Sequence, residues 1–151
     1  MNQSSQKTTT GSMLELATFS VGEAQCGIDI LKIQEINKQT QVTSVPQAPD
    51  YVVGVLNLRG RIVTVIDLGL KTGLSPITRD KDNRNIIVDS MGEHIGLLVD
   101  RISDVMSADP AHVEPPPANL GGIEGSYFEG VVKTDSGLIG VLDIERVLAE
   151  A

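Results

Sequence analysis

The side chain in this sequence best suited to bind a partner is Arg59, which lies between Leu58 and Gly60 in the short segment Asn57–Arg61. A planar guanidinium on a short turn can bind a carboxylate through two parallel hydrogen bonds. The carboxylate could belong to a partner protein, or it could be an acid of the same chain such as Glu35. One arrangement could serve both purposes, so the sequence leaves the two alternatives open.

Residues that carry out covalent or metal chemistry are scarce. The two histidines, His94 and His112, have no Cys, Asp or Glu at the spacing of a metal site, and we expect both on the surface. The single cysteine, Cys26, lies in a strand-like run and is predicted to be a buried apolar residue. The sequence has no phosphate-binding loop, dinucleotide fingerprint or nucleophile elbow. It therefore predicts a binding module that is not an enzyme and uses no metal or cofactor.

The elements that must position Arg59 are repeated within the chain. Residues 54–68 (GVLNLRGRIVTVIDL) align without gaps with residues 130–144 (GVVKTDSGLIGVLDI), and residues 16–36 align with residues 86–105 after one deletion. The two pairs occur in the same order, which indicates two related modules of ~70 residues. A module of that size buries only about 60% of its surface and would be marginally stable alone, so we expect the two to share apolar surface.

The two modules differ most informatively at the turn that carries Arg59, because the equivalent residue is Asp135. The fold therefore does not require a cation at this turn. Asp67 and Asp143, in contrast, occur in both copies, and each follows a strand and precedes a short apolar stretch. An aspartate there can accept hydrogen bonds from the free N–H groups of a helix start. We interpret both as structural, and we expect a C-terminal helix at about 144–150.

The remaining pattern predicts a mainly β protein. Many short apolar or β-branched runs end at Gly, Asn or Asp, which is typical of a sandwich or barrel rather than of β-α-β units. The first hairpin of each module is predicted to turn at Gly22–Glu23 and at Gly92–Glu93. The division that we expect is a disordered tail at 1–13 and one domain at 14–151, made of subdomains at about 14–80 and 81–145.

Apolar residues at matching places in the two modules could form a binding groove. Ile33 and Ile36 align with Ile102 and Val105. The simplest interpretation is that both stretches are core strands. If the modules are related by a pseudo-twofold axis, the stretches could converge at the seam between them, on an apolar groove shaped to hold a helix.

The charge and hydropathy of the chain exclude several classes of partner. It has 20 acidic and 12 basic residues and a formal charge of −8. Nucleic-acid binding needs clustered Lys and Arg to displace counterions, and anionic membranes attract basic segments, so neither partner is expected. No apolar run approaches the ~20 residues of a membrane-spanning helix, so we expect no direct membrane insertion. A single cysteine suits a reducing cytosol.

Five segments together form a specific pattern. They are Gly27–Ile36, Tyr51–Gly60, Ile62–Leu68, Val99–Val105 and Val113–Pro116. This pattern resembles the CheW-like family of bacterial chemotaxis coupling proteins. The resemblance implies two SH3-like five-stranded β-barrels packed together, with short helices. It also implies an adaptor that joins the regulatory domain of the histidine kinase CheA to methyl-accepting chemotaxis receptors, in the cytoplasm at receptor arrays on the inner membrane.

The resemblance further implies which residues bind the receptor and the kinase, without assigning each residue to one partner. Two alternatives to this role stay open. One is a coupling protein of a chemosensory pathway with an output other than motility. The other is a small-ligand-binding β-barrel, which would need a deep pocket with converging polar groups. The implied positions are Ile33, Glu35, Gly54, Asn57, Leu58, Arg59, Gly60, Gly96 and Val105.

Overall fold

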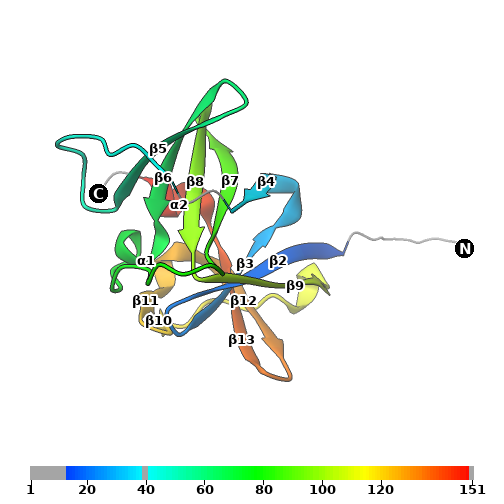
Figure 1. Cartoon of the computed structure of the whole chain (residues 1–151). Helices are drawn as coiled ribbons and strands as arrows, with labels where there is room; N and C mark the ends of the chain where they lie inside the picture. Colours follow the sequence, from blue (N-terminus) through cyan, green and yellow to red (C-terminus); the bar gives the residue numbers. More distant parts are fainter. Residues whose placement is uncertain (1–12, 39–40, 150–151) are drawn as a thin grey trace, which may run out of the picture.

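The computed structural model describes residues 13–38 and 41–149 (Figure 1). The predicted tail up to residue 12 and Glu150 of the predicted C-terminal helix lie outside the described residues. The strands are β2 (Leu14–Val21), β3 (Ala24–Asp29), β4 (Ile33–Asn37), β5 (Val52–Leu58), β6 (Arg61–Asp67), β7 (Arg84–Ser90), β8 (Glu93–Val99), β9 (Arg101–Ala108), β10 (Asn119–Leu120), β11 (Ile123–Glu124), β12 (Phe128–Thr134) and β13 (Gly137–Leu142). The helices are η1 (Ile30–Lys32), α1 (Leu68–Lys71), η2 (Pro110–His112), η3 (Gly125–Tyr127) and α2 (Ile144–Leu148).

All strands except the short pair β10 and β11 belong to two five-stranded sheets (Figure 1). The first sheet, which we call barrel A, has the order β12-β13-β3-β2-β9. The second, which we call barrel B, has the order β4-β7-β8-β6-β5. Each sheet contains one parallel pair, β13 with β3 in barrel A and β6 with β8 in barrel B, and its other neighbours are antiparallel.

Each sheet closes into a barrel through one backbone bridge. In barrel B, Thr43 beyond the end of β4 pairs with Val55 of β5 through two hydrogen bonds of 2.8 Å. In barrel A, Glu114 beyond the end of β9 pairs with Val131 of β12 through hydrogen bonds of 2.9 and 2.8 Å. Closure satisfies backbone groups that an open sheet edge would leave unpaired. The fold class expected from the sequence, two packed five-stranded SH3-like barrels with short helices, is thereby confirmed.

Two equivalent glycines permit these closures. A Cβ atom on Gly54 would overlap the carbonyl of Thr43, with 2.9 Å to the carbonyl carbon, and a Cβ on Gly130 would lie 2.6 Å from the carbonyl oxygen of Glu114. Both distances are far below ordinary van der Waals contact. Because both modules keep glycine at this position, the residue serves the fold in each barrel.

The predicted division into subdomains at 14–80 and 81–145 is wrong, because the barrels exchange strands. Barrel B takes β4, β5 and β6 from the first module and β7 and β8 from the second. Barrel A takes β2 and β3 from the first module and β9, β12 and β13 from the second. Each barrel therefore combines the first hairpin of one module with the third strand and second hairpin of the other. The predicted sharing of apolar surface is confirmed, since one buried cluster contains Phe19 of barrel A and Leu97 of barrel B.

The strand registers define which residues are equivalent in the two barrels. Val21 lies opposite Ala24 across the first hairpin, and Ser90 lies opposite Glu93 across its counterpart. The first hairpin of the second module therefore turns at Met91–Gly92, one residue earlier than predicted, with φ of 50° and 81°. Matching the two glycines by identity caused the error. According to the registers, residues of β2, β3 and β4 correspond to residues of β7, β8 and β9 at one constant offset in sequence number. The alignment of these strands therefore needs no deletion, contrary to the prediction.

Asp67 and Asp143 cap helices, as the repeat predicts. Oδ1 of Asp67 accepts a hydrogen bond of 3.0 Å from the N–H of Leu70, and Oδ1 of Asp143 accepts one of 3.1 Å from the N–H of Arg146. Oδ2 of Asp67 also accepts a bond of 3.0 Å from the N–H of Ile77. The C-terminal helix ends at residue 148, which is shorter than the predicted range.

Candidate protein-binding site

The turn between β5 and β6 presents Arg59 to solvent. Oδ1 of Asn57 accepts a hydrogen bond of 2.9 Å from the N–H of Gly60, which fixes the turn from within. Arg59 and Gly60 have φ of 53° and 83°, values in the left-handed region that a two-residue hairpin turn uses. The side chain of Arg59 is 73% exposed. The sequence prediction of a hairpin with a projecting guanidinium at its tip is confirmed.

Arg59 forms an ion pair with Glu35, so one of the two alternatives left open by the sequence is realised. Nη2 of Arg59 contacts Oε1 of Glu35 on β4. The Glu35 side chain is 27% exposed, whereas the guanidinium is mostly in solvent. An arginine has five N–H donors, and an exposed pair of this kind stabilises a fold by ~1 kcal/mol or less. The pair therefore holds the guanidinium in place while leaving donors available to a partner.

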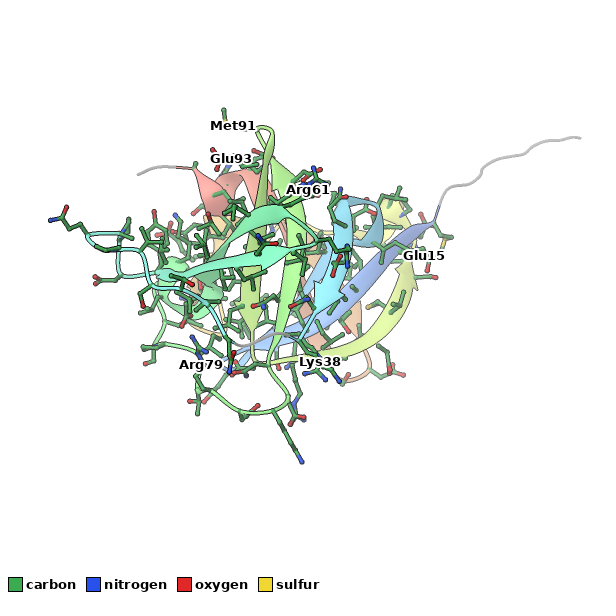
Figure 2. The ribbon with its side chains drawn as sticks, turned by 45° about the horizontal axis from the view of Figure 1, so that its top comes forward. Glu15, Lys38, Arg61, Arg79, Met91 and Glu93 are labelled. Carbon is green, nitrogen blue, oxygen red and sulfur yellow. The ribbon has the colours of Figure 1, made fainter. Side chains whose placement is uncertain are left out.

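A hollow of ≈ 140 Å³ lies beside this pair. A second cation, Arg61, lines it, and within the described residues Arg61 has no carboxylate partner. Figure 2 labels Arg61 at one end of barrel B. Arg61 was not among the site residues expected from the sequence, although its position two residues after Arg59 across the turn was a usable signal. The residues that line the hollow are Gln34, Glu35, Leu58, Arg59, Arg61, Val63, Ile87 and His94.

The prediction that His94 is a solvated surface residue is wrong. Its side chain is only 14% exposed, and Nδ1 contacts Oδ1 of Asp89 on the neighbouring strand. The error follows from the misplaced turn, because the register that turns at Met91–Gly92 puts Asp89 directly opposite His94. His112, on η2, is exposed as predicted.

Equivalent apolar side chains are exposed on β4 and β9. Ile36 is 42% exposed and lies opposite Ile86, whereas Val105 is 59% exposed and lies opposite Ala17. Ile33 behaves differently, since it is half-buried and packs against the core that the barrels share. The exposed apolar residue that β4 offers is therefore Ile36, which the sequence analysis aligned with Val105 but did not place in the site.

Both strands begin where the chain crosses between the barrels. Helix η1 joins β3 of barrel A to β4 of barrel B, and Asp100 joins β8 of barrel B to β9 of barrel A. An ion pair of 3.4 Å between Lys32 of η1 and Glu129 of β12 ties the first crossing to barrel A. Figures 1 and 2 both place β4 and β9 on the side of the molecule that carries β2. The strands that carry Ile36 and Val105 thus both lie on that side of the molecule.

The structure places two of the implied site residues inside the protein. Gly54 closes barrel B, and a Cβ on Gly96 would lie 3.2 Å from the side chain of Ile87. Both glycines are buried, so neither offers a surface to a partner. Leu58 is half-buried and packs against the shared core, whereas Asn57 and Gly60 are exposed at the hairpin.

The side chains that could supply covalent or metal chemistry do not converge in the described part of the chain. Among residues 13–38 and 41–149, no three His, Cys, Asp or Glu side chains are grouped to hold a metal ion. Cys26 is buried as predicted, and burial raises the pKa of its thiol to about 12, which keeps it protonated and weakly nucleophilic. No helix within those same ranges is long and apolar enough to cross a bilayer.

Comparison with known proteins agrees with this geometry. Residues 15–151 match the family described as the CheW-like domain. The chemotaxis protein CheW of Klebsiella aerogenes is 36% identical over 136 residues, covering 89% of this chain and 81% of that protein. CheW of Treponema pallidum is 33% identical over 139 residues, covering 89% and 82%. The scaffolding protein TtCheW of Thermoanaerobacter tengcongensis superposes with a TM-score of 0.85 at 32% identity, covering 96% of this chain and 94% of that chain. The family match over residues 15–151, the sequence identity to these relatives and the structural match together place the chain in the CheW-like family of chemotaxis proteins.

Proposed function

We propose that this protein is a cytoplasmic, non-enzymatic scaffold that couples transmembrane chemoreceptors to the histidine kinase CheA in signalling arrays. The observation that carries the proposal is the Arg59 guanidinium, exposed at a hairpin whose counterpart carries Asp135. The fold does not need this cation, yet Glu35 holds it in position. A fixed and exposed cation that serves no folding purpose is suited to a partner's carboxylate.

Two surfaces of the protein would bind the partners in this proposal. The first is the cationic hairpin end, where Arg59 and Arg61 flank a hollow whose volume, ≈ 140 Å³, suits a partner's side chain better than a small molecule. The second comprises Ile36 on β4 and Val105 on β9, which are equivalent exposed apolar residues. Exposed apolar side chains of this kind can contact the apolar face of an amphipathic helix, and the receptor supplies helical hairpins in this proposal.

Coupling, in this account, is a free energy and not a chemical step. If binding of the receptor favours the arrangement that the kinase regulatory domain binds, the kinase must favour receptor binding by the same factor. Typical coupling free energies are ~1–3 kcal/mol, which corresponds to factors of roughly 5–150 in affinity. The scaffold therefore needs only two surfaces and a rigid connection, which the shared core of the barrels provides.

Replacement of Arg59 by alanine is expected to weaken partner binding about tenfold while changing the free energy of unfolding by no more than ~1 kcal/mol. The reason is that the exposed guanidinium contributes little to folding but supplies charge-assisted hydrogen bonds to a partner. Isothermal titration calorimetry measures the affinities for a receptor-tip fragment and for the kinase regulatory domain. Unfolding in a chemical denaturant measures the free energy of unfolding of each variant.

The charge-swapped variant Arg59→Glu/Glu35→Arg separates the two roles of the guanidinium. It keeps an ion pair between the hairpin and β4 but presents a carboxylate where a partner would meet a cation. We expect both affinities to stay low in this variant. Recovery of wild-type affinity for both partners would show that Arg59 acts through the internal pair alone, and the proposed contact would be abandoned.

A further inference from the structure

Five of the 12 basic residues of this acidic chain gather at the other end of barrel B. Strand β6 runs from one end of the barrel to the other. It begins at Arg61, and Val65 near its other end lines a separate hollow there. Figure 2 shows Lys38 and Arg79 close together on the side of the molecule away from Arg61. We call this group the basic end; its members are Lys38, Arg79, Lys81, Arg84 and Arg101.

The basic end surrounds two small hollows that share one arginine. Lys38, Arg79 and Arg84 line the first hollow, a shallow one of ≈ 10 Å³ whose remaining walls are mostly apolar. Arg84 and Arg101 line the second, of ≈ 290 Å³. Arg84 therefore links the two hollows, the second of which is also lined by Asp82, the partner of Arg101. The apolar walls of the first hollow come from Val42, Val53, Val65 and Leu98.

Most of this positive charge is not neutralised within the described residues. Arg101 pairs with Asp82 at 3.1 Å. Arg84 donates to two carbonyl oxygens, those of Lys81 at 2.9 Å and Asn83 at 2.7 Å, which carry no net charge. Lys38, Arg79 and Lys81 make no ion pair with a described carboxylate. Four cations thus lack a counter-charge among the described residues, in a chain whose formal charge is −8.

Barrel A shows that the fold does not require cations here. Leu16 lies opposite Asp29 in the first hairpin of barrel A, and Asn85 lies opposite Leu98 in the equivalent hairpin of barrel B. Leu16 and Asn85 are therefore equivalent residues. The residues that precede them, Glu15 and Arg84, are equivalent as well.

Val105 on β9 and Ile36 on β4 are equivalent by the same registers. The residues two positions later, Ser107 and Lys38, are therefore equivalent as well. In barrel A, the hydroxyl of Ser107 donates a hydrogen bond of 2.5 Å to Glu15. Barrel B has replaced this bonded pair by two cations, and like charges on adjacent strands oppose folding.

We propose that the basic end is a docking surface for an acidic polypeptide segment that also carries an apolar side chain. Carboxylates of the segment compensate Lys38, Arg79, Lys81 and Arg84, and the apolar side chain covers the valine-lined hollow. An anionic membrane fits less well, because Asp80 and Asp82 lie in the same loop as Lys81 and would face a flat anionic surface together with it. A peptide can place its carboxylates at the cations and avoid these two acids. This surface is separate from the hairpin end, so the proposal does not depend on the proposed coupling site.

The test uses the full-length chain and the double variant Lys38→Ser/Arg84→Glu, which installs the pair that barrel A already accommodates at equivalent positions. The probe is a short fluorescein-labelled peptide of glutamates interspersed with leucines, followed by fluorescence anisotropy. We expect the wild-type chain to bind this peptide with an affinity that falls as salt rises. The double variant is expected to bind at least about tenfold more weakly, the result of two lost charge contacts.

Matched controls assign the effect to this surface. The variant Lys71→Ser/Lys133→Glu makes the same change in net charge at residues outside the basic end, and it should bind like the wild type. A peptide with glutamine in place of glutamate should not bind. Equal affinity of both double variants for the acidic peptide would overturn the proposal.

Two other results would overturn it in favour of a different occupant. One is absence of peptide binding together with sedimentation of the wild-type chain, but not the double variant, on phosphatidylserine vesicles. The other is absence of peptide binding together with dimers in sedimentation velocity that the double variant abolishes, which would make a second copy of the chain the occupant.

Discussion

Replacement of Gly54 by alanine is expected to lower the free energy of unfolding by ~3 kcal/mol or more. The Cβ atom would overlap the carbonyl of Thr43, and the backbone at Gly54 has a φ of 155°, which side chains rarely adopt. Relief of the overlap would break the two 2.8 Å hydrogen bonds between Thr43 and Val55 that close barrel B. Urea unfolding followed by circular dichroism measures the loss directly.

Gly60→Ala is the matched control for this prediction. Gly60 also has a positive φ, of 83°, but a Cβ there would meet no atom within 4 Å. The cost should therefore be limited to backbone strain, about 1 kcal/mol. If Gly54→Ala proved no more damaging than Gly60→Ala, the closure of barrel B would not depend on this glycine, and a direct role of Gly54 in partner binding would have to be considered again.

Val105→Glu is expected to weaken receptor binding by about 100-fold while the kinase regulatory domain still binds. A glutamate on β9 would have to lose its hydration against the apolar face of a receptor helix, at a cost of several kcal/mol. Because Val105 is 59% exposed, the change should leave the fold intact. Paired titrations of the variant against a receptor-tip fragment and the regulatory domain measure the two affinities.

The companion variants sharpen the Val105 experiment. Ile36→Glu should show the same receptor defect, since Ile36 is the exposed equivalent on β4. Ile33→Glu should also lower stability, because Ile33 packs against the shared core, so it is the weaker test. Leu138→Glu, the same kind of change on the hairpin of barrel A, should bind the receptor normally. Unchanged receptor affinity in both Val105→Glu and Ile36→Glu would exclude this side of the molecule as the docking surface.

The internal repeat predicted the local features of the fold well. A hairpin turn at Arg59–Gly60 and helix caps at Asp67 and Asp143 depend on neighbouring residues, and all are present. The pair between Arg59 and Glu35 was one of the two alternatives that the sequence left open, and it is present.

The exchange of strands between the modules could not be read from the sequence. A repeat shows which strands are equivalent, but it does not show which strands pair. The local sequence pattern would be the same whether the strands of a module paired with each other or with those of the other module. The choice depends on long-range pairing, such as β4 with β7 and β9 with β2. The one-residue error at Met91–Gly92 had a similar origin, and it hid the pairing of His94 with Asp89.

Burial explains why the glycines of the implied site were misread. A glycine in a motif gives no sign of whether it contacts a partner or permits close backbone packing. At Gly54 and Gly96 the neighbouring atoms decide the question, because a Cβ would collide with Thr43 or crowd Ile87. Both residues support barrel B, which in turn positions the hairpin and β4.

The central claim, that this protein physically joins a receptor to a kinase, is tested most directly by co-sedimentation of CheA with receptor-containing membranes. The account predicts that little kinase sediments without the protein, that the sedimented fraction rises and saturates as the protein is added, and that Arg59→Ala shifts the rise to higher concentration. Equal sedimentation of the kinase with and without the protein would contradict the account.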